Sequence, residues 1–532
     1  MTSVIVLGAG PVGLGLACEL GQRGIDCVVI EKRDGAINVP KQSVVSARNM
    51  EFCRRWGIAD KVRKAVWPES FPRDFVYLAS MRGTELMRAK VPSYEKRDPR
   101  DFTPEAACPC PQIYFDPILI EHAKTLPSVQ LCYNTEMNGF VEDANGVTAT
   151  VTDLATGEKR EIQAKYLIGC DGPAGIVRRT LGIELEGLGT ISTSINLFFR
   201  SPQLPDFHDK GWARFYRLID ETGCWSELIP IDGKELWRLT VFDEPLSTTD
   251  PDVLMRKCVG CDFPYEMISA LPWERHDYVA RSYGGGRVFI AGDAAHENSP
   301  TGGIGMHTGL EEIMNLGWKL AAVIEGWGGP QLLESYEAER RPIAHRNVSL
   351  ATRTYNALTA LPSYQEGSGA DWHAENTAAL SIPEHVKLHY GYNDSPICVD
   401  DGTPPLPADP PAFVPSTRPG TRAPHAWMAD GRSTLDLFGD SFVLLRMGGD
   451  APDATPLLEA ASRNGVPMRE IAIAEAEIVA IYEKPLVLVR PDGHVAWRGD
   501  DLPADTDAVI ARVTGHDRAA DGTIEARHRR SA

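Results

Sequence analysis

The sequence predicts an α/β protein in which a Rossmann-like dinucleotide-binding domain carries an inserted antiparallel sheet and is followed by a separate C-terminal α/β domain. At residues 4–20, a glycine-rich turn joins a short apolar strand to a helix, as a dinucleotide-binding unit requires. Residues 188–245 contain strand-like segments separated by turn signals. A stretch rich in Pro, Gly, Ser and Asp at 361–425 marks a linker before further strands.

The first element is a βαβ unit. An apolar strand at 4–7 leads into a helix, and a second strand at 27–30 ends at Glu31. The turn between strand and helix is a GxGxxG motif, formed by Gly8, Ala9, Gly10, Pro11, Val12 and Gly13. The first glycine permits a tight turn, the second lets a pyrophosphate approach the backbone, and the third lets helix and strand pack closely. The helix N-terminus can bind the pyrophosphate through its unpaired N–H groups.

Glu31 stands where a carboxylate can accept hydrogen bonds from a ribose. Because a carboxylate there repels a 2′-phosphate, we expect that the tightly bound nucleotide is not NADP. The motif alone does not choose between NAD and FAD. The neighbouring residues Lys32 and Arg33 join Glu31 as candidate cofactor-binding residues.

Helices and strands follow one another along the rest of the chain. Helical patterns occupy residues 45–65, 117–124, 308–325, 331–358 and 457–464. Strand patterns occupy residues 147–151, 166–168, 195–199, 213–218, 224–229, 236–241, 288–291, 441–446 and 486–490. The strands between 195 and 241 predict an antiparallel sheet inserted in the α/β domain.

The composition excludes several classes of function. At roughly 150 residues a domain, 532 residues suggest two to four domains. The net charge of −19 disfavours nucleic acid and anionic membrane surfaces as partners. No apolar run approaches the roughly 20 residues of a membrane span, and no N-terminal signal is visible. The 11 cysteines favour reduced thiols in a cytoplasmic protein, and the pair Cys258 and Cys261 lacks the second ligand pair of a zinc site.

Three further segments contain candidate polar residues. The first consists of Gly292, Asp293, Ala294, Ala295 and His296, followed by Ser299, Pro300, Thr301, Gly302, Gly303, Ile304, Gly305 and Met306. The second consists of Gly169, Cys170, Asp171 and Gly172. The third consists of Lys41, Arg48 and, further along the chain, Gln112.

With the first turn, these segments resemble the class A flavoprotein aromatic hydroxylases of the para-hydroxybenzoate hydroxylase type. The chain is most similar to the phenol-type enzymes that act on 2-hydroxybiphenyl, hydroxyphenylpropionate or pentachlorophenol, over nearly its whole length. The resemblance implies non-covalent FAD whose ribityl hydroxyls contact Asp293. It places the isoalloxazine ring beside Pro300, Gly303, Gly305 and Met306, where a helix N-terminus can stabilise negative charge on the reduced flavin. It also implies cofactor contacts for Lys41, Arg48, Gln112 and Asp171.

The chain departs from the family's pattern at several positions, where Gly175 replaces Ser, Lys41 replaces Arg, Ser43 replaces the His of several relatives, His307 replaces Asn, and Glu311 with Glu312 replaces Gln-Asp. Two interpretations stay open for His307, a histidine that titrates near the flavin and one whose ring is satisfied by hydrogen bonds. Arg48 is alternatively a solvated helix residue, and Gln112 a turn residue.

The resemblance also divides the chain into domains. It implies a discontinuous FAD-binding domain at residues 1–70, 101–187 and 275–360, and a substrate domain at 71–100 and 188–274. A linker at 361–415 precedes a thioredoxin-like C-terminal domain at 416–532. Because that domain has no CxxC motif, we expect it to be structural or to form a homodimer contact, and not to be redox-active.

The implied activity is that of a single-component monooxygenase that hydroxylates a phenolic aromatic compound ortho or para to its hydroxyl. NADPH or NADH reduces FAD, and the reduced flavin captures O₂ as a C4a-hydroperoxide. Since no second complete GxGxxG is present, the nicotinamide binds transiently. Two alternatives stay open on the same fold, a polyketide-tailoring hydroxylase and a Baeyer–Villiger monooxygenase. A flavin halogenase is disfavoured because its Trp-x-Trp pair is absent, and a non-catalytic FAD-binding protein is less favoured.

We expect the aromatic substrate between the inserted sheet and the flavin. Candidate lining residues are Phe198, Tyr216, Trp225, Trp237 and Arg238. The alternative for each is a place in the packed face of the sheet. The candidate catalytic residues are Tyr216, Trp225, Pro300, Gly303 and His307.

Overall fold

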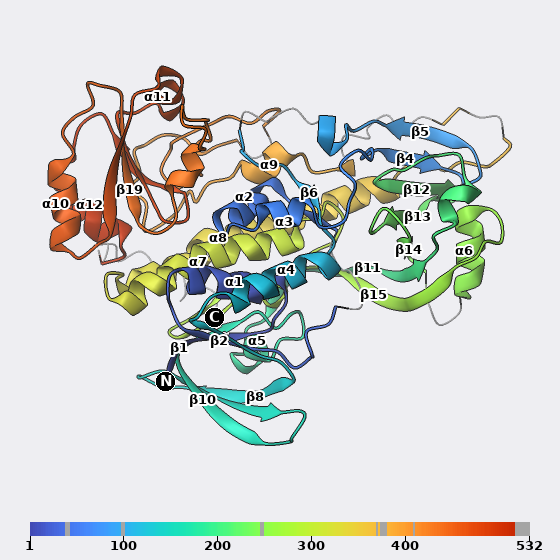
Figure 1. Ribbon diagram of the computed structural model, residues 1–532, viewed down its shortest axis with the longest axis horizontal. Coiled ribbons are helices and arrows are strands. Elements are labelled where there is room, and N and C mark those ends of the chain that lie inside the picture. Colours follow the sequence, from blue (N-terminus) through green and yellow to red (C-terminus); the bar gives the residue numbers. More distant parts are fainter. Residues whose placement is uncertain are drawn as a thin grey trace.

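The computed structural model describes residues 1–37, 43–96, 102–244, 249–368, 371–372, 380–407 and 410–516. Two eight-stranded sheets, one four-stranded sheet and a two-stranded pair form the described fold (Figure 1). The expected α/β class is therefore confirmed. Lys41, a candidate cofactor contact, lies outside the described residues.

The first sheet contains the glycine-rich turn. Its strand β1 (Thr2–Leu7) pairs in parallel with β2 (Cys27–Ile30) and β10 (Lys159–Gly169). The other members are β7 (Val129–Cys132), β8 (Thr135–Glu142), β9 (Val147–Asp153), β16 (Gly284–Gly285) and β17 (Val288–Ile290). Because β1, β10 and β17 are parallel, their carboxyl ends meet at one edge of the sheet. The turns that follow these three strands are thereby brought together.

Helices cover one side of this sheet. Figure 1 shows α1 (Pro11–Gln22), α4 (Gln112–Lys124) and α7 (Gly305–Glu325) stacked over it. Residues 4–6 of β1 are fully buried, which explains why this strand is an uninterrupted apolar run and not an alternating one. The long helix α8 (Pro330–Thr359) packs on α7 and reaches the second sheet.

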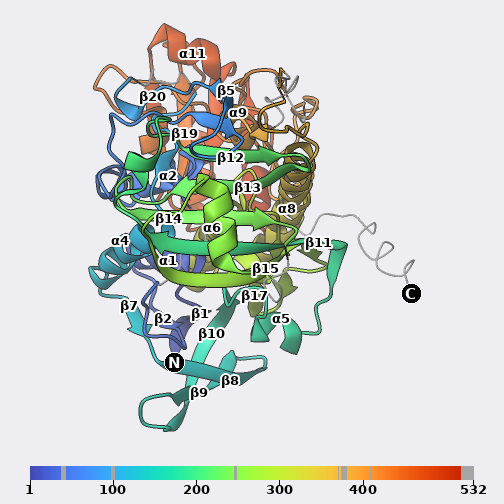
Figure 2. The ribbon, with the colours of Figure 1, turned by 90° about the vertical axis from the view of Figure 1, so that its right-hand side faces the viewer.

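The second sheet confirms the expected inserted antiparallel sheet. Its strand order is β18-β15-β11-β14-β13-β12-β4-β5, and β4 runs parallel to β12. Its bounds are β4 (Phe75–Leu78), β5 (Glu85–Ala89), β11 (Leu185–Arg200), β12 (Phe215–Asp220), β13 (Gly223–Pro230), β14 (Leu236–Phe242), β15 (Glu266–Ala280) and β18 (His296–Glu297). Helix α6 (Pro251–Val259) lies across the outer face of this sheet, where Figure 2 shows it nearest the viewer.

The C-terminal residues form a small α/β unit with thioredoxin-like topology. The sheet order is β20-β19-β21-β22, with β19 and β20 parallel and the other pairs antiparallel. The elements are β19 (Phe442–Met447), α10 (Thr455–Arg463), β20 (Met468–Ile473), α11 (Ala476–Tyr482), β21 (Leu486–Val489), β22 (Val495–Gly499) and α12 (Thr506–Val513). No cysteine occurs after Cys398, so this unit cannot carry a dithiol site.

The segment expected to be a linker is packed against the rest of the protein where it is described. It contains the short helix α9 (Glu384–Leu388), and the side chains of Ile382, Val386 and Leu388 are buried. Ile382 and Val386 share a cluster with Ile304, at the start of α7. This segment therefore contributes to the core beside the glycine-rich loop at 300–305.

The described residues contain no helix that is long and apolar enough to cross a membrane. Within the same ranges, no group of three or more His, Cys, Asp or Glu side chains could hold a metal ion. All 11 cysteines are free thiols, and eight of them are buried. Cys258 belongs to α6 and packs under the second sheet, as expected of an ordinary thiol.

Candidate active site

The first glycine-rich turn combines tight packing with one open position. A Cβ on Gly13 would lie 1.9 Å from the carbonyl oxygen of Gly8, and a Cβ on Gly8 would lie 2.4 Å from that of Cys170. No heavy atom lies within 4 Å of a Cβ built on Gly10. Gly10 is also the N-cap of α1, and no side chain caps this helix end. The turn thus leaves space and unpaired N–H groups for a ligand phosphate.

Glu31 is fixed beside this turn at the end of β2. One carboxylate oxygen accepts the backbone N–H of Ala9 at 2.9 Å, and the other accepts that of Arg33 at 3.0 Å. Each oxygen has further lone pairs, so the carboxylate can still accept hydrogen bonds from ribose hydroxyls. The side chains of Lys32 and Arg33 are exposed at the rim.

The second turn follows β17 and is held by α7. The backbone N–H of Gly292 donates to Glu312 Oε2 at 2.8 Å. His296 Nε2 lies 3.3 Å from Glu312 Oε1, and both side chains are buried. Burial opposes protonation of His296, but the neighbouring Glu312 carboxylate raises the pKa of this imidazole above its usual value. The carboxylate of Asp293 is exposed and makes no hydrogen bond to any described residue, so it is available to a ligand.

The two turns are in contact. A Cβ on Gly292 would lie 3.0 Å from a methyl carbon of Val12, in the first turn of α1. A Cβ on Gly309 would lie 2.6 Å from the same side chain and 2.9 Å from Gly292 Cα. Glycine at 309 thus lets α7 approach α1 closely. Like α1, α7 has no side-chain cap at its N-terminus, so both helices present free N–H groups in this region.

The loop from Pro300 to Gly305 leads into α7. Gly303 donates its N–H to the carbonyl of Pro300 at 2.9 Å, has a φ of +61° and has no heavy atom within 4 Å of its Cβ position. A Cβ on Gly302 would meet Ile382 at 2.6 Å. Met306 is half-buried in the first turn of α7. The loop is therefore packed on the side of Ile382 and open at Gly303.

His307 is a buried histidine with defined partners. Its Nε2 lies 3.1 Å from the backbone nitrogen of Ser46 and 2.9 Å from the carbonyl oxygen of Val44. Burial lowers the pKa of His307 to about 4. The ring is therefore neutral at pH 7. It is hydrogen-bonded through Nε2, whereas its buried Nδ1 has no hydrogen-bond partner among the described residues. It ties β3 (Val44–Val45) and the start of α2 (Ala47–Arg55) to α7.

Arg48 has structural partners. This buried residue of α2 forms an ion pair with Glu51 at 2.7 Å and donates to the carbonyl of Asp492 at 3.3 Å. Arg422 binds the same Glu51 carboxylate. The guanidinium thus joins α2 to the C-terminal unit, and its contact with a cofactor stays a prediction. The alternative of a solvated helix residue is wrong, because the side chain is buried.

Gln112 and Asp171 stabilise helix starts. Gln112 is the first residue of α4 and donates to Asp116 at 3.0 Å, one turn along the helix. Asp171 accepts the N–H of Val177 at 3.2 Å, at the start of α5 (Ile176–Thr180), and burial raises its pKa. A Cβ on Gly175 would lie 2.4 Å from Asp171 Oδ1. Glycine in place of the usual serine therefore gives this carboxylate room.

The second sheet separates the candidate substrate residues onto two faces. Tyr216, Trp225 and Trp237 belong to the cluster beneath α6, on the outer face. The ammonium of Lys257, from α6, lies 4.1 Å from the Trp225 ring centroid. These aromatic side chains therefore do not face the FAD-binding side, and this corrects the preference for Tyr216 and Trp225.

The opposite face turns toward the FAD-binding side. Phe198 packs there with Ile229 and with Ile113 of α4. Arg238 is the register partner of both Phe198 and Ile229, so it shares their face. The alternating pattern of each strand identified these residues as candidates for the buried faces of the sheet. It could not show which of the two faces α6 would cover.

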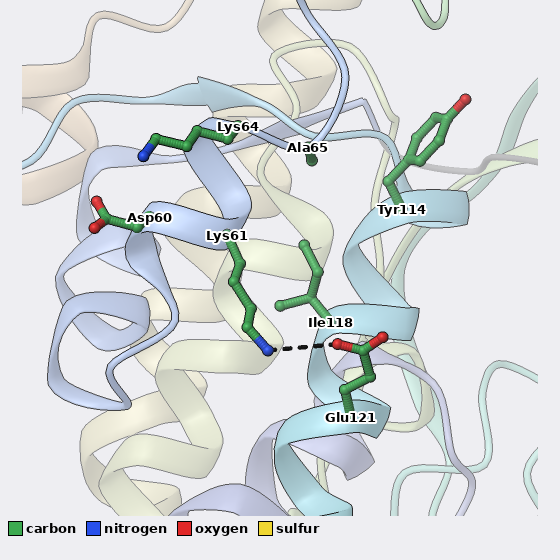
Figure 3. Close-up of a pocket in the computed structure, with 7 residues that line it drawn as sticks. All are labelled: Asp60, Lys61, Lys64, Ala65, Tyr114, Ile118 and Glu121. Atoms are coloured by element: carbon green, nitrogen blue, oxygen red, sulfur yellow. Dashed lines mark hydrogen bonds and ion pairs between the residues drawn. The ribbon is translucent and has the colours of Figure 1, made fainter.

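A separate surface hollow of about 550 Å³ lies between α3 (Ala59–Arg63) and α4 (Figure 3). In Figure 3, Lys61 reaches across it to Glu121, with a 3.4 Å ion pair. None of its lining residues belongs to the glycine turns or to the loop at 300–305. The hollow is therefore separate from the candidate active site, despite its volume.

Comparisons with known proteins agree with the geometry. Residues 1–351 match the FAD binding domain family, and residues 416–516 match the aromatic-ring hydroxylase C-terminal family. A putative polyketide hydroxylase of Streptomyces halstedii is 33% identical over 94% of each chain. The structure of the rebeccamycin biosynthetic enzyme RebC with reduced flavin has a TM-score of 0.88 and 36% identity, and covers 97% of this chain and 99% of its own. Aklavinone-11 hydroxylase with FAD and aklavinone has a TM-score of 0.81 and 28% identity over the same shares. The chain therefore belongs to the FAD-binding aromatic-ring hydroxylases, the class A flavoprotein monooxygenases.

Proposed function

We propose that this protein uses NADH or NADPH and O₂ to hydroxylate a phenolic aromatic substrate, ortho or para to its hydroxyl. The observation that carries the proposal is the contact between Val12 and Gly292, which joins the two glycine turns into one elongated site. Bound FAD would supply the redox chemistry, accepting electrons from the nicotinamide and activating O₂. The protein's own residues bind and orient this cofactor.

Each end of the proposed site has residues suited to one part of FAD. The open backbone at Gly10 and the N-terminus of α1 receive the pyrophosphate, while Glu31 binds the adenosine ribose. The exposed carboxylate of Asp293 accepts the ribityl hydroxyls. Gly303 leaves space for the isoalloxazine ring, and the uncapped N-terminus of α7 favours negative charge on it.

The aromatic substrate lies, in this proposal, against the inner face of the second sheet. Phe198, Phe215 and Ile229 give that face an apolar surface that excludes water. The guanidinium of Arg238 on the same face is suited to a phenolate oxygen. These residues replace Tyr216 and Trp225 as candidate substrate contacts.

A polyketide-tailoring hydroxylase is the second candidate. It is favoured by the similarity to the Streptomyces halstedii protein and to aklavinone-11 hydroxylase, both over nearly the whole chain. The two candidates share their chemistry and differ in substrate size. Monocyclic phenols and polycyclic phenolic compounds of the aklavinone kind therefore belong in one screen.

The test starts from purified protein, which should be yellow with an FAD spectrum. A suitable phenol should stimulate NAD(P)H oxidation, and mass spectrometry under ¹⁸O₂ should find a single labelled oxygen on the aromatic ring. A labelled lactone would instead indicate Baeyer–Villiger insertion. Bound FAD without O₂-dependent turnover on any phenol would indicate a non-catalytic protein, and a colourless protein indifferent to FAD would refute the proposal.

A further inference from the structure

Arg275 connects the second sheet to the loop at 300–305. It belongs to β15 and its side chain is 1% exposed. Its Nη1 donates to Ser299 Oγ at 2.8 Å and to Thr301 Oγ1 at 3.2 Å. These two hydroxyls flank Pro300. A single nitrogen of the guanidinium thus holds the loop on both sides of the proline.

The rest of this guanidinium also contacts neutral groups, while the carboxylates of Glu227 and Asp243 act on it only from beyond ion-pair distance. Nε donates to Ser192 Oγ at 3.2 Å, and Nη2 lies 3.5 Å from Ser194 Oγ, both on β11. The ring of Tyr355, from α8, lies 4.0 Å from the guanidinium carbon. Among the described residues, no carboxylate forms an ion pair with Arg275.

A buried charge without a carboxylate partner is costly to desolvate. Burial accordingly lowers the pKa of Arg275, although a guanidinium stays protonated at neutral pH. A neutral side chain of similar size would avoid this cost. An arginine at this position is therefore better explained by its hydrogen bonds and positive charge at the adjoining loop than by a contribution to the stability of the sheet.

We propose that Arg275 is a positioning residue that fixes the loop from Ser299 to Gly303 and supplies it with a buried positive charge. The loop is open to a ligand at Gly303, so its position affects where the isoalloxazine ring can lie. A positive charge behind the loop favours the anionic, reduced form of a flavin bound there. The second part of this inference rests on the proposed function, whereas the first concerns the protein alone.

The experiment compares hydrogen–deuterium exchange of the amides at 299–303 in the FAD-saturated protein and its variants. Arg275→Gln removes both the positive charge and the planar set of N–H donors of the guanidinium. Arg275→Lys keeps the charge but cannot reproduce that planar set of donors. The double variant Ser299→Ala with Thr301→Val removes the acceptors from the loop side. Arg281→Gln is the matched control, because Arg281 follows the same strand but is exposed.

We expect exchange at 299–303 to become at least about tenfold faster in both Arg275 variants and in the double variant, but not in the control. The reduction potential of bound FAD should fall in Arg275→Gln and stay near the wild-type value in Arg275→Lys and in the double variant. Wild-type exchange in the folded variants would overturn the positioning role, and the double variant decides this if Arg275→Gln does not fold. Equal potentials in Arg275→Gln and Arg275→Lys would overturn the role of the charge. Because exchange is measured without substrate, failure of the proposed hydroxylation leaves the positioning result unaffected.

Discussion

The carboxylate of Glu312 accepts the backbone N–H of Gly292 across 2.8 Å, and its other oxygen faces His296. A residue on α7 thus holds the turn that carries Asp293. Glu312→Ala would leave a buried N–H and a buried imidazole without their partner. We expect a loss of about 3–5 kcal/mol in the free energy of unfolding, measured by urea denaturation, together with loss of FAD. Glu312→Gln keeps one acceptor, so it should lose less stability; an unchanged midpoint in Glu312→Ala would contradict the assignment.

The glycines of the first turn should respond differently to alanine. Gly13→Ala places a methyl group against the Gly8 carbonyl, so this variant should be severely destabilised. Gly10→Ala meets no neighbour within 4 Å, and the φ of −75° suits alanine. Its apoprotein should therefore melt within a few degrees of the wild type. FAD should nevertheless bind at least about tenfold more weakly, because the methyl group occupies the approach of the pyrophosphate. Gly139→Ala, which also points into open space, is the control; equal FAD affinity in Gly10→Ala would refute the phosphate site.

Asp293 offers a test of the other end of the cofactor. The carboxylate has no partner among the described residues, so Asp293→Ala should leave the melting temperature of the apoprotein unchanged. FAD affinity should fall by at least about tenfold, since a charge-assisted hydrogen bond to the ribityl chain is lost. Fluorescence titration of the apoprotein with FAD measures this. Asp450→Ala, an exposed aspartate of the C-terminal unit, should bind FAD like the wild type.

The sequence was sufficient to predict the parts of the site that depend on local geometry. The turn at Gly8, Gly10 and Gly13 could be recognised because strand, turn and helix are contiguous. The turn at Asp293 could be placed because it follows an apolar strand in a glycine-rich context, and the contact of Asp293 with FAD stays a prediction. The thioredoxin-like topology of the C-terminal unit was predicted from the resemblance to the family. The observed strand order of that unit agrees with the prediction.

The parts that could not be predicted depend on distant residues. The burial of Arg48 could not be predicted because the Asp492 carbonyl that it binds, and the Arg422 that shares its partner Glu51, lie more than 370 positions away in the chain. Tyr216 and Trp225 looked like substrate contacts because both faces of their sheet are buried, so apolar alternation does not distinguish them. Glu312 stood out only as a departure from the family's pattern, and its contact with the turn could not be predicted because the packing of α7 sets it.

The C-terminal unit should be inseparable from the FAD-binding part. Glu339 on α8 binds Lys319 at 2.7 Å and Arg490 at 2.5 Å, and all three side chains are fully buried. Glu339→Gln leaves the buried ammonium of Lys319 without its counter-charge and leaves Arg490 paired with Asp492 alone. It should lower the free energy of unfolding by about 3–5 kcal/mol and make the segment at 399–407 more sensitive to proteolysis. The exposed pair of Arg463 and Asp507 provides the control, because Asp507→Asn should cost less than about 1 kcal/mol.

The neutral state of His307 predicts a dependence of stability on pH. The folded pKa of about 4 lies below the value of 6.5 for an ordinary histidine, so between these values the unfolded chain binds the proton more tightly. The contribution of His307 is therefore fully present above pH 6.5 and is lost as the pH falls toward 4. Between pH 7 and 5 this loss should be about 2 kcal/mol.

His307→Asn removes the titration while keeping a side chain that can hydrogen bond near Val44 and Ser46. In urea unfolding at both pH values, the variant should lose about 2 kcal/mol less than the wild type on acidification. Other titrating groups are common to the two proteins and cancel in this comparison. If the two proteins lose equal stability, His307 is not the buried, neutral base that ties the start of α7 to β3, and a titrating role near the cofactor would have to be reconsidered.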